Sequence, residues 1–351
     1  MPTIDDVAIK AGVSKTTVSR VINNNGYVKA ETLKSVQKAI SELNYRPNIA
    51  ARGLVTNRRM NTIAHIMIDI DDMIHVTINK GIEEACFKRG YSTIVCDANA
   101  KDRENEYINM IIDKSIGGAI FHHLDISAEQ VELMHSAGVK CVLIDNENEI
   151  PLVPNIYTNN YLGGYLAAQH LIERGHTKIG CMFGVMSQPK PEDGHVEYID
   201  TFQYNIWKQR TRGFYNGLKA YGLKVHKNYF YQGDGTLKHG LKKANNIMTE
   251  ILSSTDRPTA IYCENDVMAL GALNAALKQK LDIPQEIAIM GHDGLAIVDA
   301  FYPKITTIVQ PQYRMGYLAS NIVMDLIEGK KRIKKFEKII LEPRLAIGET
   351  T

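Results

Sequence analysis

Residues 3–23 read TIDDVAIKAGVSKTTVSRVIN, and this stretch decides the fold of the N-terminal part of the chain. Thr3 followed by Asp6 is a pattern that begins a helix, and apolar residues then recur at spacings of three and four as far as Gly12. Ser14 can cap a second helix that has its own apolar stripe. Two helices joined by a short link that contains a glycine indicate a helix-turn-helix.

A third amphipathic segment follows, and it offers a surface against which the first two helices can pack. Its apolar side consists of Leu33, Val36, Ile40 and Leu43. The outward face of the second helix is polar and carries Lys15, Thr16, Ser19 and Arg20. A polar face on a short helix is often only solvated, so this face by itself leaves both DNA binding and simple solvation open.

Residues 3–58 resemble the DNA-binding headpiece of the lactose/galactose repressor (LacI/GalR) family. The positions that carry the resemblance are 6–8, 11–14, 17–21, 44–48, 50, 52 and 54. The resemblance extends more loosely over the rest of the chain. It implies a homodimeric transcriptional repressor that binds a palindromic operator in double-stranded DNA and responds to a small-molecule effector.

The resemblance also implies which residues contact DNA. The complete expected set is Ser14, Lys15, Thr16, Thr17, Ser19, Arg20, Asn23, Tyr27, Asn48, Ala51 and Leu54. Within it, Lys15, Thr16 and Arg20 are expected to meet base edges in the major groove, where a basic side chain can bind guanine and Thr can contact a thymine methyl group. Ser14, Thr17, Asn23 and the backbone near Tyr27 are expected to contact phosphates, which position the helix without specifying sequence.

Residues 48–59 are expected to form a hinge helix and linker. In the family, a leucine of this helix wedges between two base pairs from the minor groove, and the matching residue here is Leu54. Gly53 disfavours a helix by about 1 kcal/mol relative to Ala, so we expect the hinge to be helical only when paired with its dimer mate on DNA. The alternative is that Leu54 is an exposed linker residue.

Charge is unevenly distributed along the 351-residue chain. The first 58 residues contain nine Lys and Arg against four Asp and Glu, whereas the whole chain has a net charge of +2. A basic head on a mildly acidic body suits a phosphate-binding module joined to a sensor. The sequence shows no long apolar run and no apolar signal region, so we expect a cytoplasmic protein without membrane association. Five scattered cysteines favour reduced thiols over disulfides.

Beyond residue 60, short apolar runs alternate with amphipathic helices, which indicates parallel sheets covered on both faces. Strands are predicted at 63–70, 92–97, 117–121, 139–145, 178–183, 229–233, 259–263, 287–290 and 307–309. Together with the resemblance, this alternation implies a periplasmic-binding-protein-like α/β effector domain made of two parallel-sheet subdomains. In the family the chain crosses between the subdomains three times, and we expect crossings near 159–163, 306–312 and 338–344.

The expected organisation is a helix-turn-helix DNA-binding domain at 1–47, the hinge helix and linker at 48–59, and an effector-binding and dimerisation domain at 60–351. Within the last domain, we expect an N-subdomain of about 60–160 and 291–308 with part of the C-terminal region. The C-subdomain is expected to contain about 161–290 and the remaining C-terminal region.

Polar residues follow many of the predicted strands, at ends that would face a cleft between the two subdomains. They are Asp69, Asp71, Asp72, Asp97, Asn99, Asp145, Asn146, Glu264, Asn265, Asp266, His292 and Asp293. Carboxylates and amides can each bridge neighbouring hydroxyl groups, so this set favours a sugar as the effector. Strand ends are polar in many proteins, so any single member is also compatible with an ordinary loop. The resemblance makes Arg210, Asn265 and Asp293 the first candidates for contact with the effector. Asp72 and His75 are the next candidates.

One departure from the family concerns aromatic stacking. Some sugar-binding members place a stacking tryptophan where this chain has Gly235. The only tryptophan, Trp207, ends an unusually long segment, 186–207. Our hypothesis is that this segment folds over the cleft and that Trp207 supplies the missing stacking surface. A surface loop unrelated to the effector is the alternative.

Other protein classes fit the sequence less well. The chain lacks the Gly-x-Ser-x-Gly, Gly-x-x-x-x-Gly-Lys-Ser/Thr and Gly-x-Gly-x-x-Gly signatures, so we expect no enzyme, no catalytic residue and no cofactor. His122 and His123 could suggest a metal ion, but neighbours on a strand point to opposite faces, so no metal site is predicted. A solute-binding protein would need a signal peptide and no headpiece. A sugar phosphate, a purine or a protein co-regulator remains open as the effector.

Overall fold

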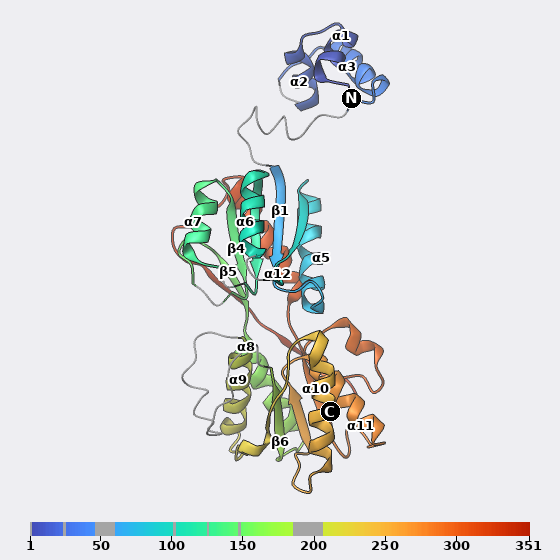
Figure 1. Ribbon diagram of the computed structural model, residues 1–351, viewed down its shortest axis with the longest axis vertical. Coiled ribbons are helices and arrows are strands. Elements are labelled where there is room, and N and C mark those ends of the chain that lie inside the picture. The colour runs from blue at the N-terminus through green and yellow to red at the C-terminus, as the bar shows by residue number, and fades with distance from the viewer. Residues whose placement is uncertain are drawn as a thin grey trace. The chain divides into compact units, whose positions relative to one another are not determined.

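The computed structural model describes residues 2–23, 26–45, 60–100, 103–124, 126–146, 149–184 and 206–351. The chain divides into two compact units, Met1–Met60 and Asn61–Thr351, which we treat separately (Figure 1). The expected hinge residues Asn48, Ala51 and Leu54 lie outside the described residues, and so does the boundary expected between 47 and 48.

The N-terminal unit contains the helices α1 (Ile4–Ala11), α2 (Lys15–Asn23) and α3 (Ala30–Glu42). Thr3 and Asp6 form the predicted capping box: the Thr3 N–H donates to Asp6 Oδ2 at 2.7 Å, and the Asp6 N–H donates to Thr3 Oγ1 at 3.3 Å. Gly12 ends α1 in the left-handed conformation, with φ of 66°. The helices enclose a small core of Val7, Ala8, Val18, Val36 and Ala39. The predicted helix-turn-helix is confirmed.

The second unit contains two six-stranded sheets. The first has the order β11-β5-β4-β3-β1-β2. Its strands are β1 (Met60–Met67), β2 (Ser92–Asp97), β3 (Ile116–His122), β4 (Lys140–Ile144), β5 (Asn155–Thr158) and β11 (Lys338–Leu341). The second has the order β12-β10-β9-β8-β6-β7. Its strands are β6 (Ile179–Phe183), β7 (Phe230–Gln232), β8 (Ala260–Cys263), β9 (Ala288–Asp293), β10 (Thr306–Val309) and β12 (Arg344–Ala346). β12 pairs antiparallel with β10 at the edge, whereas β6, β8, β9 and β10 pair in parallel.

Helices cover both faces of each sheet, as Figure 1 shows. The first sheet is covered by α5 (Met73–Lys88) and α12 (Gln312–Ile327) on one face and by α6 (Arg103–Asp113) and α7 (Ala128–Ser136) on the other. The second is covered by α8 (Asn160–Glu173) and α9 (Ile206–Ala220) on one face and by α10 (Leu237–Ser253) and α11 (Asp266–Lys278) on the other. Short 3-10 turns lie at Lys227–Tyr229 and Ala296–Ala300.

Each sheet has a hydrophobic core on each of its two faces, and successive side chains of a strand point alternately into one core and the other. In β4, Val142 and Ile144 pack with α5 and α12, whereas Cys141 and Leu143 pack with α6 and α7. All four residues are buried, and this explains why the sequence of a strand covered on both faces reads as a continuous apolar run. The prediction of two parallel-sheet subdomains is confirmed.

The chain crosses between the sheets three times, near the three predicted places. It leaves the first sheet after β5 and enters α8, returns between β10 and α12, and crosses finally between β11 and β12. The prediction that 291–308 belongs to the N-subdomain is wrong. The end of β9 and most of β10 fall in that range, and both strands pair within the second sheet, with Thr306 opposite Met290. The chain therefore crosses only after Val309, where α12 packs on α5.

The five cysteines, Cys86, Cys96, Cys141, Cys181 and Cys263, are buried free thiols, in agreement with the prediction. Among the described residues, no helix is both long and apolar enough to span a bilayer.

Candidate nucleic-acid interface and effector site

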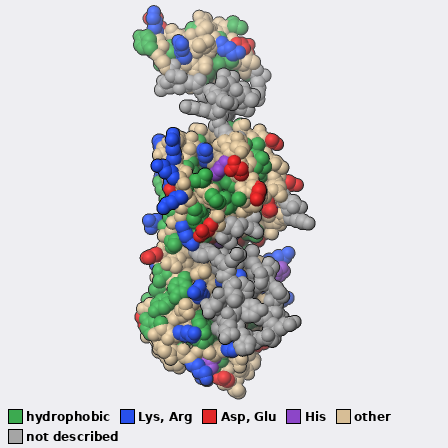
Figure 2. Space-filling model, turned by 90° about the vertical axis from the view of Figure 1, so that its left-hand side faces the viewer, with side chains coloured by type: hydrophobic (Ala, Val, Ile, Leu, Met, Phe, Trp, Pro, Cys, Tyr) green, Lys and Arg blue, Asp and Glu red, His purple; other side chains and the backbone are tan. Residues whose placement is uncertain are grey.

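The residues expected to read bases lie at the start and along the outer side of α2. The side chains of Lys15, Thr16 and Arg20 are exposed, whereas Val18 on the same helix is fully buried. The Lys15 ammonium pairs with Asp5 Oδ2 at 2.9 Å, but both side chains are more than half exposed, so water and salt screen this pair strongly. On the face drawn in Figure 2, Lys and Arg side chains stand out on the N-terminal unit. A DNA phosphate or base could therefore replace Asp5 as the partner of Lys15.

Two of the expected phosphate contacts, Ser14 and Thr17, lie at the N-terminus of α2. Ser14 caps the helix, since its Oγ accepts the Thr17 N–H at 3.2 Å and lies 2.9 Å from the Thr17 hydroxyl oxygen. The partial positive charge of a helix N-terminus favours a phosphate at this place. Tyr27 is 89% exposed, and Ser19 is half-buried on α2. Asn23 is the last residue of α2. The DNA-contact roles of these residues stay predictions.

The second unit brings together Arg210 and Asp293, two of the residues predicted to contact the effector. Arg210 is 2% exposed on α9, and its Nη2 lies 2.9 Å from Oδ1 of Asp293 at the end of β9. Arg210 Nε donates to Asn160 Oδ1 at 3.0 Å, and Nη1 donates to the main-chain carbonyl of Glu264. Gln310 donates from Nε2 to Asp293 Oδ1 at 2.6 Å, and Gln312 donates to the Asp293 carbonyl at 2.8 Å. We call these six residues the Arg210 network.

The network is strongly polar although it is buried. Burial raises the pKa of Asp293 to about 6, and the positive charge of Arg210 opposes this rise. Burial also raises the pKa of Glu264 to about 8. For Arg210, burial acts to lower the pKa, but the negative charges around it, that of Asp293 first, outweigh burial, so the guanidinium stays charged. Asp293 has a φ of 110°, a left-handed backbone conformation rare for a residue with a side chain, which is a form of local strain common at ligand sites.

Asn265 has a structural role in addition to its expected effector role. It caps α11: its Oδ1 accepts the Met268 N–H at 2.8 Å, and its Nδ2 donates to the Gly235 carbonyl at 2.8 Å. Asn265 is 4% exposed, so both ends of its amide are committed within the protein. The cap ties α11 to the loop after β7, directly beside the Arg210 network.

Trp207 fills the space that a side chain at position 235 would need. A Cβ built on Gly235 would overlap one edge of the indole ring, and a Cβ on Gly184 would overlap the other edge. The guanidinium carbon of Arg210 lies 5.2 Å from the centroid of the Trp207 ring. The indole thus lies beside the Arg210 network. The part of the hypothesis that concerns 186–205 falls outside the described residues.

Asp72 and His75 lie on the first-sheet side. Asp72 caps α5 by accepting the Ile74 N–H at 3.1 Å, and its charge contributes to the raised pKa of Asp293. His75 is 1% exposed, and its Nδ1 hydrogen-bonds to the main-chain carbonyl of Asp69 at 2.5 Å. The two groups therefore approach the Arg210 network without a direct hydrogen bond to it in the described residues.

Sequence reasoning missed Asn160, Gln310 and Gln312 as members of this site. A signal was present, because all three lie at or beside the predicted crossings near 159–163 and 306–312. Glu264 was named only as one of many strand-end residues, and its burial could not be read from the sequence.

Comparisons with known proteins agree across both units. A family profile described as "Bacterial regulatory proteins, lacI family" matches residues 3–48, and one described as "Periplasmic binding protein-like domain" matches residues 168–351. The HTH-type transcriptional repressor PurR of Photobacterium profundum is 32% identical over 353 residues, covering 100% of this chain and 98% of that protein. PurR of Aliivibrio salmonicida is 33% identical over 332 residues, covering 94% of this chain and 93% of that protein.

Solved structures share the fold over the whole chain. The lac repressor dimer bound to operator and the anti-inducer ONPF has a TM-score of 0.82 and 23% identity, and covers 100% of this chain and 99% of that one. The complex of the transcriptional regulator CelR with cellobiose has a TM-score of 0.68, 24% identity and full coverage of both chains. Because relatives above 30% identity align over nearly their entire length, the chain belongs to the lacI family of bacterial regulatory proteins.

Proposed function

We propose that this DNA-binding transcription regulator is a homodimeric repressor, and that a small ligand bound at the Arg210 network sets its affinity for a palindromic operator. The observation that carries the proposal is the position of the network at two of the three crossings between the sheets. Asn160 begins α8 directly after the first crossing, and Gln310 lies at the second. A ligand that displaces or joins the Arg210–Asp293 pair would therefore act on the segments about which the two subdomains can move.

The chemistry of the network favours a sugar as the ligand. Arg210 can donate to adjacent hydroxyl oxygens, and Asp293 can accept from adjacent hydroxyl groups. The Trp207 indole beside them offers an apolar face of the kind on which sugar rings stack. A planar nucleobase is the second candidate, because the same indole suits it equally and the relatives at 32% and 33% identity carry the name PurR.

The energy required for control is modest. A 100-fold change in operator affinity corresponds to about 2.7 kcal/mol of coupling between the ligand and DNA sites. Rearranging a buried, hydrogen-bonded ion pair such as Arg210–Asp293 involves free energies of roughly 3–5 kcal/mol, which is enough. We propose that the ligand acts through binding alone and that no chemical step is involved.

The proposal is tested with the full-length protein in two steps. Selection from a pool of randomised DNA duplexes should yield a palindromic site, whose affinity is then measured by fluorescence anisotropy. A thermal-shift screen of free sugars, sugar phosphates, nucleobases and nucleosides follows, and a ligand at 100 times its Kd should stabilise the protein by about 2.7 kcal/mol.

A sugar that both stabilises the protein and changes operator affinity would support the proposal. A response confined to nucleobases or nucleosides would select the second candidate. Tight operator binding without a response to any compound would contradict control by these ligands and would direct attention to a protein co-regulator.

A further inference from the structure

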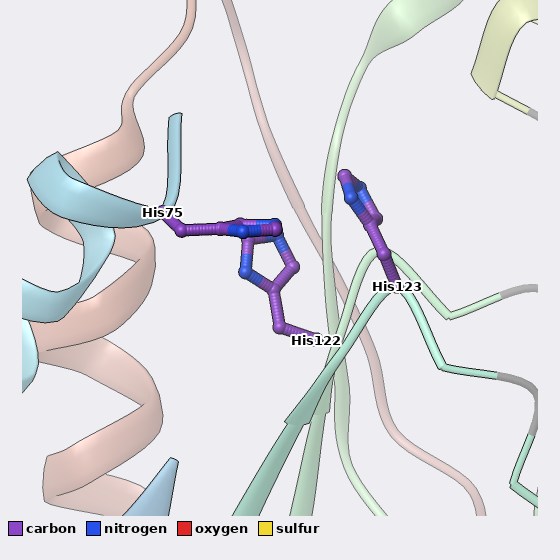
Figure 3. Close-up of side chains that lie close together, drawn as sticks. All are labelled: His75, His122 and His123. Carbon is purple, nitrogen blue, oxygen red and sulfur yellow. The ribbon is translucent and has the colours of Figure 1, made fainter. Parts of the chain in front are cut away.

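Three histidines from two separate parts of the sequence meet at the carboxyl end of the first sheet. His75 lies near the start of α5, His122 is the last residue of β3, and His123 follows it. Their imidazole nitrogens, one from each ring, lie within 4.8 Å of one another. The ring centroid of His122 is 4.4 Å from that of His75 and 4.3 Å from that of His123 (Figure 3). We call these residues the histidine cluster.

The backbone of His123 makes the cluster possible. Its φ is 54°, so the extended conformation of β3 ends at His122 and the usual alternation of side chains is broken. The prediction that these two histidines point to opposite faces, and hence the reason for predicting no metal site, is wrong. In Figure 3 the His75 side chain extends from its helix toward His122, and the His123 ring stands beside them.

Most imidazole nitrogens of the cluster lack hydrogen-bond partners among the described residues. His75 Nδ1 must donate its hydrogen to the Asp69 carbonyl, since a carbonyl oxygen can only accept, and Nε2 then carries a lone pair. His75 Nε2, His123 Nε2 and both nitrogens of His122 are buried without a hydrogen bond within the described part of the chain. Buried polar atoms without partners are costly, so this arrangement calls for an explanation.

The protonation states of His122 and His75 suit metal coordination. Burial, together with the neighbouring His123 and His75, lowers the pKa of His122 well below its ordinary value. Burial and His123 also lower the pKa of His75. Both rings are therefore neutral near pH 7 and present lone pairs, which is the form that binds metal ions.

We propose that His75, His122 and His123 bind a divalent transition-metal ion, with Zn²⁺ as the best match to three imidazoles. Zinc–nitrogen bonds of about 2.0–2.1 Å in a tetrahedral site place ligand nitrogens roughly 3.3 Å apart, so small rotations of the rings close the cluster around the ion. The Asp69 carbonyl already orients His75 through its other nitrogen, as outer hydrogen-bond partners do at histidine-ligated metals. His123, whose side chain is 17% exposed, is the most exposed member of the cluster.

Three histidines leave a fourth coordination position, and its surroundings connect the ion to the effector site. Asp145 Oδ2 lies 3.8 Å from His123 Nε2, and the charge of Asp145 also contributes to the raised pKa of Arg210. A water molecule or an oxygen of the effector could occupy the fourth position. The proposal goes beyond control by a sugar, because it adds a metal ion as a second small partner of the sensor.

The test measures metal binding by the full-length protein, with any polyhistidine tag removed and with metals stripped by a chelator. Titration with Zn²⁺ in competition with a chromophoric chelator should give one ion per chain. Co²⁺ should produce the strong visible absorption of a tetrahedral complex. His123→Asn and His75→Gln should each weaken Zn²⁺ binding by about tenfold or more, because each removes one of three ligands.

His135→Asn is the matched control, since His135 is a partly buried histidine of the same subdomain on α7 and lies outside the cluster. It should bind Zn²⁺ like the wild type. Two variants are used so that misfolding of one does not decide the result, and circular dichroism checks that each is folded. The proposal is overturned if the wild type binds no Zn²⁺ at one ion per chain, or if folded His123→Asn and His75→Gln proteins bind it as tightly as the wild type. Neither readout uses DNA or effector, so such a result leaves the proposed repressor function standing.

Discussion

Replacement of Glu264 by Gln should remove much of the pH dependence of stability in the second unit. Glu264 is completely buried; its Oε2 accepts the Gly184 N–H at 3.1 Å, and its Oε1 accepts the Thr211 hydroxyl. Burial raises the pKa of this carboxyl group from an ordinary 4.5 to about 8. At neutral pH the native protein therefore holds a proton that the unfolded chain has lost. Gln has nearly the shape of the protonated acid and can keep the contact with Gly184.

The sign and size of the effect follow from proton linkage. A folded-state pKa above the unfolded value means that the native state binds the proton more tightly than the unfolded state does. The bound proton therefore stabilises the native state, and this stabilisation is lost as the pH rises from 4.5 toward 8. Within this window Glu264 should lower the free energy of unfolding by about 1.4 kcal/mol for each pH unit, and by roughly 3–5 kcal/mol in total. Glu264→Gln should lack this contribution and should be more stable than the wild type near pH 8.

Urea unfolding at pH 5.5, 6.5 and 7.5, followed by the fluorescence of the single tryptophan Trp207, measures the effect where it arises. Glu250→Gln on the exposed side of α10 is the control and should keep the wild-type pH slope. An unchanged pH slope in Glu264→Gln would refute the reasoning, because it would mean that the buried carboxyl group is already ionised in the native protein.

Three further outcomes test the sites separately. Lys15→Ala should weaken operator binding by about 5- to 100-fold in anisotropy titrations without changing the melting temperature, because the side chain is exposed; a wild-type affinity would remove Lys15 from base recognition. Arg210→Ala should abolish the effect of the ligand on operator binding, and retention of the ligand response would contradict the proposed effector site. Gly235→Ala should destabilise the protein by about 1–3 kcal/mol through overlap with the indole, and should cost much less in a Trp207→Ala background; equal costs in the two backgrounds would show that the contact is not responsible.

Local signals in the sequence determined much of the fold. The capping box of Thr3 and Asp6, the glycine that ends α1 and the apolar spacing of three helices depend on residues a few positions apart, so the helix-turn-helix could be predicted without tertiary information. Most of the buried strands could be predicted because both of their faces are apolar, so their sequences read as short continuous apolar runs. β5, β11 and β12 do not read as continuous apolar runs, because β5 begins and ends with Asn155 and Thr158, and β11 and β12 are partly exposed edge strands that begin with Lys338 and Arg344.

Which sheet a strand joins is decided by hydrogen bonds to residues far along the chain, and periodicity carries no information about them. For this reason the sequence could predict strands near 287–290 and 307–309 but assigned 291–308 to the wrong subdomain. The same limit explains the Arg210 network, in which Asn160, Arg210 and Asp293 come from three separate elements. The sequence could offer Arg210 and Asp293 as candidates, but only the fold decided that they bind each other.

The sequence by itself therefore determined the helix-turn-helix, the two-sheet architecture and the short list of polar groups at the strand ends. Only the tertiary structure decided that Trp207 occupies the space beside Gly235 and that His75, His122 and His123 meet. The first contact depends on how α9 packs against the loop after β7. The second depends on the left-handed backbone conformation of His123, directly after β3, which turns its side chain away from the direction that strand alternation dictates.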